Sequence, residues 1–109
     1  MALQKIIILP SGVSGDYSRI THFRWDRTTR EASALIDLYL DAATAVSGSP
    51  LRPIVAKLRL SGDKFDLYLS NAALAASDND VVAQLYLAAK TEGVISDFGA
   101  TLYADAADV

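Results

Sequence analysis

The most regular alternation of apolar and polar positions lies in two runs of the first half, joined by a polar turn. Residues 17–26 are rich in aromatic and β-branched side chains, which favour a strand. Residues 27–30 contain no apolar side chain and are expected to form the connection. By the two-residue period of a strand, the side chains expected on one face of the first run are Tyr17, Arg19, Thr21, Phe23 and Trp25.

Residues 31–40 continue the pattern and predict the partner strand. A slip of one residue would place Asp37 and Asp41 in the core, so the pairing register is expected to be strongly specified. A helix is the competing interpretation, because Ala and Leu also suit one. The apolar positions that share a face in the strand interpretation are Ala32, Ala34, Ile36, Leu38 and Leu40.

Further strands are predicted on both sides of this pair. Residues 4–9 form a short apolar run that ends at a Pro-Ser-Gly turn, so they predict a first hairpin, with about seven residues leading into Tyr17. Residues 51–60 alternate again, and Pro53 near their start suits the beginning of a strand or an exposed edge. The positions expected on the apolar side of this strand are Ile54, Ala56, Leu58 and Leu60.

Residues 61–64, Ser-Gly-Asp-Lys, are typical of a tight turn. Behind them Phe65, Leu67 and Leu69 alternate with polar or amphipathic neighbours, which predicts a second hairpin with a strand over residues 65–70. Residues 42–50 are small and polar, and we expect them to prolong the preceding element and then to form a mobile loop at residues 47–50.

The last third contains the predicted helix. Residues 71–76 are expected to form at most a helical turn, and Ser77 is the expected cap of the helix that follows. An apolar stripe at helical spacing then leads to Lys90 and to Gly93, where a left-handed cap is expected. The stripe consists of Val81, Val82, Leu85, Tyr86, Ala88 and Ala89.

These patterns predict an α+β, mainly β fold in a single domain over residues 1–109. We expect an antiparallel β-sheet or a small β-sandwich with one C-terminal amphipathic helix. The hairpins occupy residues 1–70, the helix residues 78–92 and a C-terminal tail residues 94–109. The tail is expected either to dock as a last strand or to lie flexible, because most of its residues are small or acidic.

Composition excludes several kinds of site. The 109 residues include no cysteine, so disulfides, thiolate catalysis and cysteine metal sites are excluded. His22 is the only histidine, so no metal site and no cofactor is expected. No apolar run approaches the roughly 18 residues that a membrane span requires. The short apolar start lacks the pattern of a signal peptide, and we expect folding in a cytoplasm.

Charge is distributed unevenly along the chain. Residues 1–64 carry nine of the ten Lys and Arg against six acids, a net charge of +3, whereas residues 65–109 carry one against seven, a net charge of −6. Two interpretations remain open. The oppositely charged parts can attract across a subunit contact, or they can neutralise each other within one fold.

Three patterns in the sequence could in principle support chemistry. A Ser-His-Asp site would need His22 as its base, yet this histidine lies within a predicted strand. Carboxylate pairs at residues 37 and 41 or 63 and 66 could act as acid and base, but solvated strand and turn carboxylates are far commoner. Residues 11–16 lack the lysine and the helix of a phosphate loop. We therefore expect no enzyme and no small-molecule substrate.

Arginines gather around the turn at residues 27–30, beside Phe23 and Trp25. A basic patch with aromatic side chains can hold nucleic acid, but the chain is acidic overall and Asp26 and Glu31 lie nearby, so no nucleic acid is expected. A tryptophan beside arginines is also common in protein interfaces. The candidate interface residues, from this turn and from the acidic C-terminal tail, are Arg24, Trp25, Arg27, Arg30, Tyr103, Asp105 and Asp108.

Two segments carry a resemblance. The chain opens with MALQKIIILPSGV (residues 1–13) and continues with YSRI (residues 17–20); it later contains AQLYLAAKT (residues 83–91), Phe98 and the ending ADAADV (residues 104–109). These segments cover about a third of the chain. They resemble a group of small proteins encoded among the virion structural genes of tailed phages and prophages. Such proteins open with a short strand, a turn and a Tyr-x-Arg strand, and end with a Tyr- and Lys-bearing helix, a phenylalanine and an Ala/Asp tail.

This resemblance implies a structural part of a phage tail, tail tip or baseplate, located in the virion and in the host cytoplasm during assembly. Its partners would be other virion proteins in a multi-copy assembly, and it implies no catalytic residues. Two alternatives stay open. One is a free-standing domain that recognises a host protein or a carbohydrate through loops such as residues 47–50. The other is a capsid decoration or head–tail joining protein.

Overall fold

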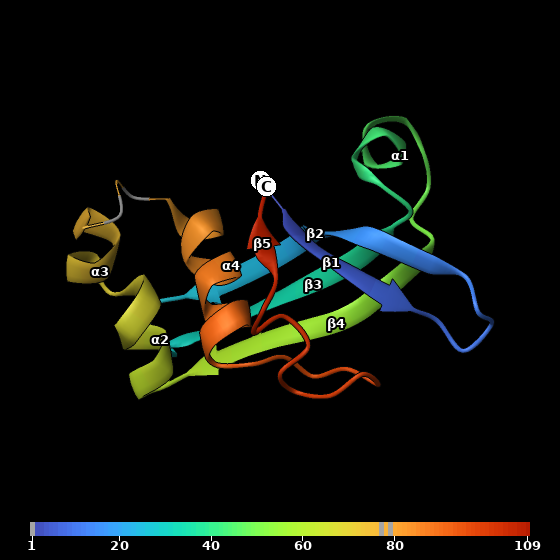
Figure 1. The fold of residues 1–109 in the computed structure, drawn as a ribbon. Coiled ribbons are helices and arrows are strands. Elements are labelled where there is room, and N and C mark those ends of the chain that lie inside the picture. Colours follow the sequence, from blue (N-terminus) through green and yellow to red (C-terminus); the bar gives the residue numbers. More distant parts are fainter. Residues whose placement is uncertain (1, 77, 79) are drawn as a thin grey trace.

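Five antiparallel strands form one sheet in the order β4-β3-β2-β1-β5 (Figure 1). The computed structural model describes residues 2–76, 78 and 80–109. A mainly β, α+β architecture is therefore confirmed, and the sheet is single where a sandwich was the alternative. The strands are β1 (Leu3–Ile8), β2 (Ser14–Asp26), β3 (Glu31–Tyr39), β4 (Arg52–Ser61) and β5 (Ala107–Asp108).

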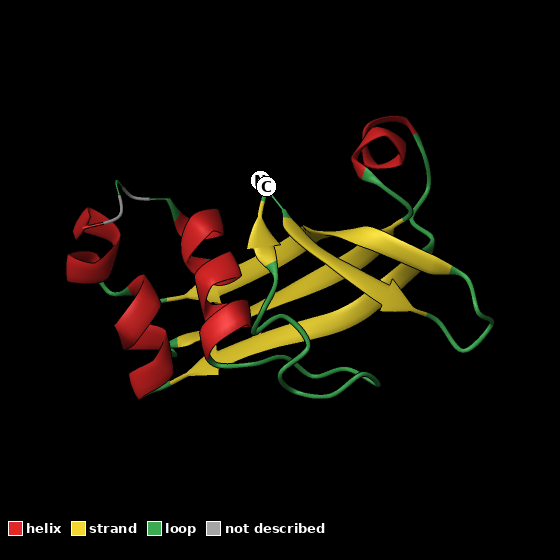
Figure 2. Cartoon of the chain, in the orientation of Figure 1, coloured by secondary structure: helices red, strands yellow, loops and turns green. Residues whose placement is uncertain are grey.

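Four helices accompany the sheet in the described part of the chain, where the sequence predicted one (Figure 2). The region expected to be helical contains α4, and the carboxylate of Asp80 caps its first turn by accepting the Ala83 N–H at 2.9 Å. The expected cap, Ser77, lies outside the described residues. The helices are α1 (Ala42–Ser47), α2 (Asp63–Leu69), α3 (Asn71–Ala76) and α4 (Val81–Thr91).

The central strand pair β2–β3 forms as predicted, but β2 contains an irregularity that the alternation did not reveal. The pairing register shifts between Ile20 and His22, so a β-bulge interrupts the ladder. Before the bulge Ile20 faces the core, and after it Phe23 and Trp25 lie on the same side of the sheet, because they pair with the buried Ala34 and Ala32; Trp25 packs against the core, whereas Phe23 remains 43% exposed. The prediction of one continuous face from Tyr17 to Trp25 is therefore wrong.

Strands β3 and β4 follow their predicted alternation along most of their length. The apolar face of β3 is buried from Ala32 to Leu38, whereas Leu40 lies beyond the strand and is half exposed. In β4 the buried side chains include Ala56, Leu58 and Leu60. Ile54 was expected in the core but is exposed, because its backbone has a positive φ of 51° beside a second register shift.

Residues 63–69 form helix α2, so the predicted strand over residues 65–70 is wrong. Asp63 and Asp66 lie in the first turn, where the helix dipole favours negative charge. Phe65 and Leu69, four residues apart, are both buried, while Leu67 is 60% exposed. The apolar spacing of this segment fits a helix as well as a strand, and packing against the core selects the helix.

Two connections also differ from their predictions. The β1–β2 hairpin connection spans residues 9–13, shorter than expected, because β2 already begins at Ser14. Residues 42–47, expected to prolong the strand or to be loop, form α1. Asp41 caps this helix by accepting the Thr44 N–H at 2.8 Å, a hydrogen bond that lowers the pKa of the Asp41 carboxyl.

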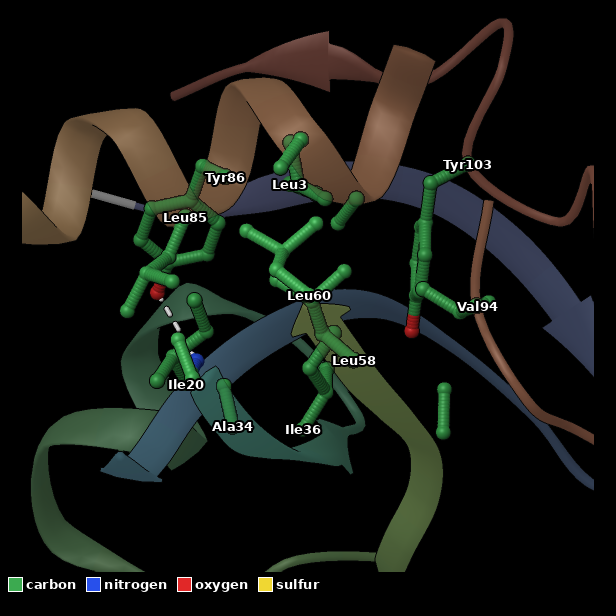
Figure 3. Close-up of a cluster of buried hydrophobic side chains, with 14 of the residues drawn as sticks. Leu3, Ile20, Ala34, Ile36, Leu58, Leu60, Leu85, Tyr86, Val94 and Tyr103 are labelled. Carbon is green, nitrogen blue, oxygen red and sulfur yellow. Dashed lines mark hydrogen bonds between the residues drawn. The ribbon is translucent and has the colours of Figure 1, made fainter. Parts of the chain in front are cut away.

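The C-terminal segment is part of the core. Its Tyr103 side chain is fully buried, and Ala2 and Val109 exchange backbone hydrogen bonds of 2.9 and 3.0 Å, which bring the two ends together. Figure 3 shows the core between the sheet and α4, with Leu85 and Tyr86 pointing towards the strands. The Tyr86 hydroxyl accepts the Ile20 N–H at 2.8 Å, at the point where the bulge interrupts the ladder.

Candidate functional site

The sheet has two unlike faces across β2, β3 and β4. One face packs into the core with the buried side chains of α2, α3 and α4; we call it the core face. The other, which we call the outer face, follows from the strand register and carries mainly polar side chains, all exposed or partly exposed. The outer face consists of Arg19, His22, Arg24, Ser33, Leu35, Asp37, Lys57 and Arg59.

Two cross-strand rows organise the outer face. Arg24 and Arg59 both pair with Ser33, so the two arginines flank this serine from the neighbouring strands. His22 and Lys57 flank Leu35 in the same way one row further along. Strands two apart are separated by about 10 Å, so the side chains of one row can reach a common group placed over β3.

The cations of the outer face are not paired with carboxylates. Among the described residues, Arg19, Arg24, Lys57 and Arg59 form no ion pair within 4 Å. Asp37 lies among them, and its carboxylate accepts the Ile54 N–H at 2.7 Å. The outer face is therefore a positively charged surface on an acidic protein.

Other cations of the first 64 residues are neutralised by the acidic second part, mostly at exposed positions. The hydrogen bond from Lys64 and, second to it, the one from Tyr68 hold the pKa of the Glu92 carboxyl below its usual value, against the opposite effect of desolvation. The oppositely charged parts of the chain therefore neutralise each other within one fold at these positions, which is one of the two interpretations. The pairs are Lys5–Asp105, Arg30–Asp66, Arg52–Asp97 and Lys64–Glu92.

An open hollow of about 560 Å³ lies over one end of the outer face. Arg24, Ser33 and Arg59 line it, together with Asp26 and Glu31 next to the β2–β3 turn. The two arginines thus project around a concave surface, where a bound group would lose part of its water and feel their charge more strongly. Planar guanidinium groups bind carboxylate or phosphate oxygens in pairs, so the part of the hollow over Ser33, between Arg24 and Arg59, is suited to an anion.

Most candidate side chains of the arginine-rich turn have partners within the fold. Arg30 hydrogen-bonds to Asp66 through Nε at 3.2 Å and also lies 3.5 Å from Asp63; the Asp66 contact is the main reason that its pKa is raised. Arg27 stacks over the Trp25 ring, with 4.9 Å from Cζ to the centroid. Trp25 itself is partly buried against the core. Of the four predicted turn residues, only Arg24 belongs to the outer face.

The three candidates from the C-terminal tail are not part of this surface. Tyr103 was expected at an interface but is fully buried, and its hydroxyl donates to the Ser18 Oγ at 2.9 Å, so it cannot contact a partner. Asp105 and Asp108 are exposed but paired with Lys5 at 2.7 Å and with Lys90 at 3.2 Å. The Lys5 hydrogen bond lowers the pKa of Asp105.

Of the residues that could perform chemistry, Asp63 and Asp66 come together only as partners of Arg30, and the others lie apart. His22 is exposed, and the polar group beside its ring is the Thr21 hydroxyl at 3.2 Å. Asp37 and Asp41 accept different backbone N–H groups, from Ile54 and Thr44. Within residues 2–76, 78 and 80–109, no three His, Cys, Asp or Glu side chains are placed to hold a metal ion. Over the same residues, no helix is both long and apolar enough to cross a membrane.

Sequence reasoning missed half of the cationic surface. Lys57 and Arg59 were recognised as the polar side of a strand but were not connected with Arg24, because strand order cannot be read from one sequence. Arg19 was assigned to the face of Phe23 and Trp25, and the bulge separates them. The available signal was the alternation of Lys57 and Arg59 with buried neighbours in β4.

Comparisons with protein families, with curated proteins and with solved structures find no match for this chain.

Proposed function

We propose that this chain is a non-enzymatic structural component of a tailed-phage virion, part of the tail, the tail tip or the baseplate. It acts through contacts with other virion proteins, in several copies, and is made in the host cytoplasm before assembly. The observation that carries the proposal is spatial. The segments that resemble small phage structural proteins, which are far apart in the sequence, pack together as β1, the first half of β2, α4 and β5.

Individual residues of the resembling segments support one another in this unit. Ile20 donates its N–H to the hydroxyl of Tyr86, which joins the Tyr-x-Arg strand to the late helix (Figure 3). Lys90 of that helix lies 3.2 Å from Asp108 in the Ala/Asp ending, and Asp108 is paired in register with Leu3. The shared pattern therefore describes a scaffold, which is what a structural role requires, and it assigns no residue to catalysis.

The surface supports the same proposal. Burial of the core face accounts for the fold, and the outer face keeps unpaired cations at exposed positions that the core does not use. A short β5 and the bridge between Lys57 and Ile95 protect parts of the sheet edges, so contact through a face is favoured over strand addition. A sheet that buries one face in the core and presents a polar face to solvent suits a subunit held among different neighbours.

The test is mass spectrometry of purified particles from the phage or lysogen that encodes this chain. The proposal predicts that the chain copurifies with tail proteins at constant stoichiometry through a density gradient. An abundant cytoplasmic host protein serves as the control for contamination. Recovery of the chain only in the soluble lysate, at the level of that control, would contradict the proposal.

A further inference from the structure

The outer face combines exposed cations, a hollow and the absence of a covering element in the described chain. We infer that it docks an acidic segment of another protein, whose carboxylates bind Arg24 and Arg59 over Ser33. The identity of that partner as a neighbouring virion protein rests on the proposed function. The docking itself depends only on this surface.

The spacing of the cations fits an extended acidic segment. Lys57 and Arg59 are two residues apart on β4 and point to the same side, so they lie about 7 Å apart along the strand. Carboxylates two residues apart in an extended partner have the same spacing. Arg24 and Arg59 receive a carboxylate from opposite sides of β3, and Arg19 extends the positive charge along β2.

A second copy of this chain fits less well. The acids of its C-terminal part are engaged within their own molecule, as Glu92 is with Lys64, Asp97 with Arg52 and Asp105 with Lys5. Asp41 and Asp80 cap helices, so their carboxylates also have partners. Docking a copy through these groups would break existing contacts, whereas a separate acidic segment would not.

Nucleic acid also fits less well. Single strands are held by stacking on exposed aromatic side chains together with phosphate contacts. Phe23 projects from the core face; Trp25 lines the hollow, but Arg27 stacks over its ring and the side chain packs against the core, so it offers no free ring face to a base. Asp26 and Glu31 also line the hollow and repel any anion near them, so a short acidic segment that reaches only Arg24 and Arg59 is favoured over a continuous phosphate backbone.

The experiment measures fluorescence anisotropy of a labelled oligoglutamate peptide with the purified full-length chain, at low and at physiological salt. We expect saturable binding that weakens as salt rises, since exposed charges are screened. The variant Arg24→Gln/Arg59→Gln is expected to bind the peptide at least about tenfold more weakly, because two guanidinium–carboxylate contacts are lost. A labelled oligothymidylate of equal charge is measured in parallel.

The matched control is Arg52→Gln/Lys64→Gln, which removes the same two charges from ion pairs away from the outer face. It is expected to bind the peptide within about threefold of the original protein. Thermal unfolding of all three proteins verifies that each is folded. Equal weakening by both double variants, or no binding of the peptide, would overturn the inference.

Tighter binding of the oligothymidylate than of the peptide, lost in Arg24→Gln/Arg59→Gln, would also overturn it in favour of a nucleic acid site. Salt-sensitive self-association in sedimentation without the peptide, lost in Arg24→Gln/Arg59→Gln, would replace the acidic partner by a second copy. Particle mass spectrometry reports independently on the proposed function. If the chain binds the peptide but is absent from particles, the docking inference stands and the proposed virion function is wrong.

Discussion

The two faces of the central sheet differ in burial and in side-chain contacts, even between consecutive residues of one strand. Leu58 on the core face is 1% exposed and packs in the main core, whereas Arg59, the next residue of the same strand, is exposed and unpaired within the described chain. The same contrast holds for Ala34 and Ser33 on β3. Stability and binding are thus assigned to opposite sides of one sheet, and substitutions can separate them.

The largest expected effect is on the core face. Leu58→Ala should lower the free energy of unfolding by about 2–5 kcal/mol, because a fully buried leucine leaves a cavity. Its matched control, Arg59→Gln, should change the free energy of unfolding by no more than about 0.5 kcal/mol, because the Arg59 side chain is exposed and forms no ion pair. Urea unfolding measures both, and equal costs for the two variants would contradict the division of roles.

The hydrogen bond at the bulge comes next. Tyr86→Phe removes the acceptor of the Ile20 N–H and should cost about 1–3 kcal/mol, since a buried donor then lacks its partner. The comparison is Tyr17→Phe, because Tyr17 lies on the other side of the sheet and its ring packs edge-on against that of Tyr39, with 6.5 Å between the ring centroids. If both substitutions lower the free energy of unfolding equally in urea, the hydrogen bond from Ile20 to Tyr86 does not stabilise the bulge.

Ionisation of Tyr103 should lower the free energy of unfolding at alkaline pH. Burial raises the pKa of its hydroxyl to about 12, while an unfolded tyrosine ionises near its usual 10. The unfolded state therefore releases its proton first, and stability should fall as pH rises from 10 through 12. Tyr103→Phe should flatten this limb of the stability profile, even though it loses the Ser18 hydrogen bond. An unchanged alkaline limb in the variant would argue against a buried hydroxyl.

The smallest expected effect concerns the surface ion pairs. Contacts with Lys64 and Tyr68 lower the pKa of Glu92 below its ordinary 4.5, so this contribution to stability is present above 4.5 and is lost as pH falls through the lowered pKa. Lys64→Gln should therefore reduce the loss of stability on acidification, with little change at high salt. Unfolding midpoints across the acidic range measure it. A larger acid dependence in the variant would contradict the assignment.

Much of the sheet could be predicted because local alternation determines which residues face inwards. The runs that became β1, β2, β3 and β4 were recognised from apolar period and turn residues alone. The segment that became α2 was not, since Phe65, Leu67 and Leu69 satisfy a strand period while Phe65 and Leu69 also satisfy a helical one. Only contact with the rest of the core separates these two interpretations.

The candidate site was harder to predict, because it depends on which strands are neighbours. Arg24 and Arg59 are 35 positions apart and meet across β3 only in the folded sheet. A single bulged residue moved Trp25 to the opposite face from Tyr17 and Arg19, and no residue type in β2 indicates this bulge. Tyr103 was misassigned because a tail of small and acidic residues gives little sign that its aromatic ring is the buried anchor.

A reconstruction of the assembled particle at side-chain resolution tests the central claim most directly, since it shows what covers each face of the sheet. The account predicts that a neighbouring protein lies over Ser33, with its carboxylate oxygens within 4 Å of the guanidinium groups of Arg24 and Arg59. An outer face open to solvent, with the neighbours bound to the helices instead, would contradict it.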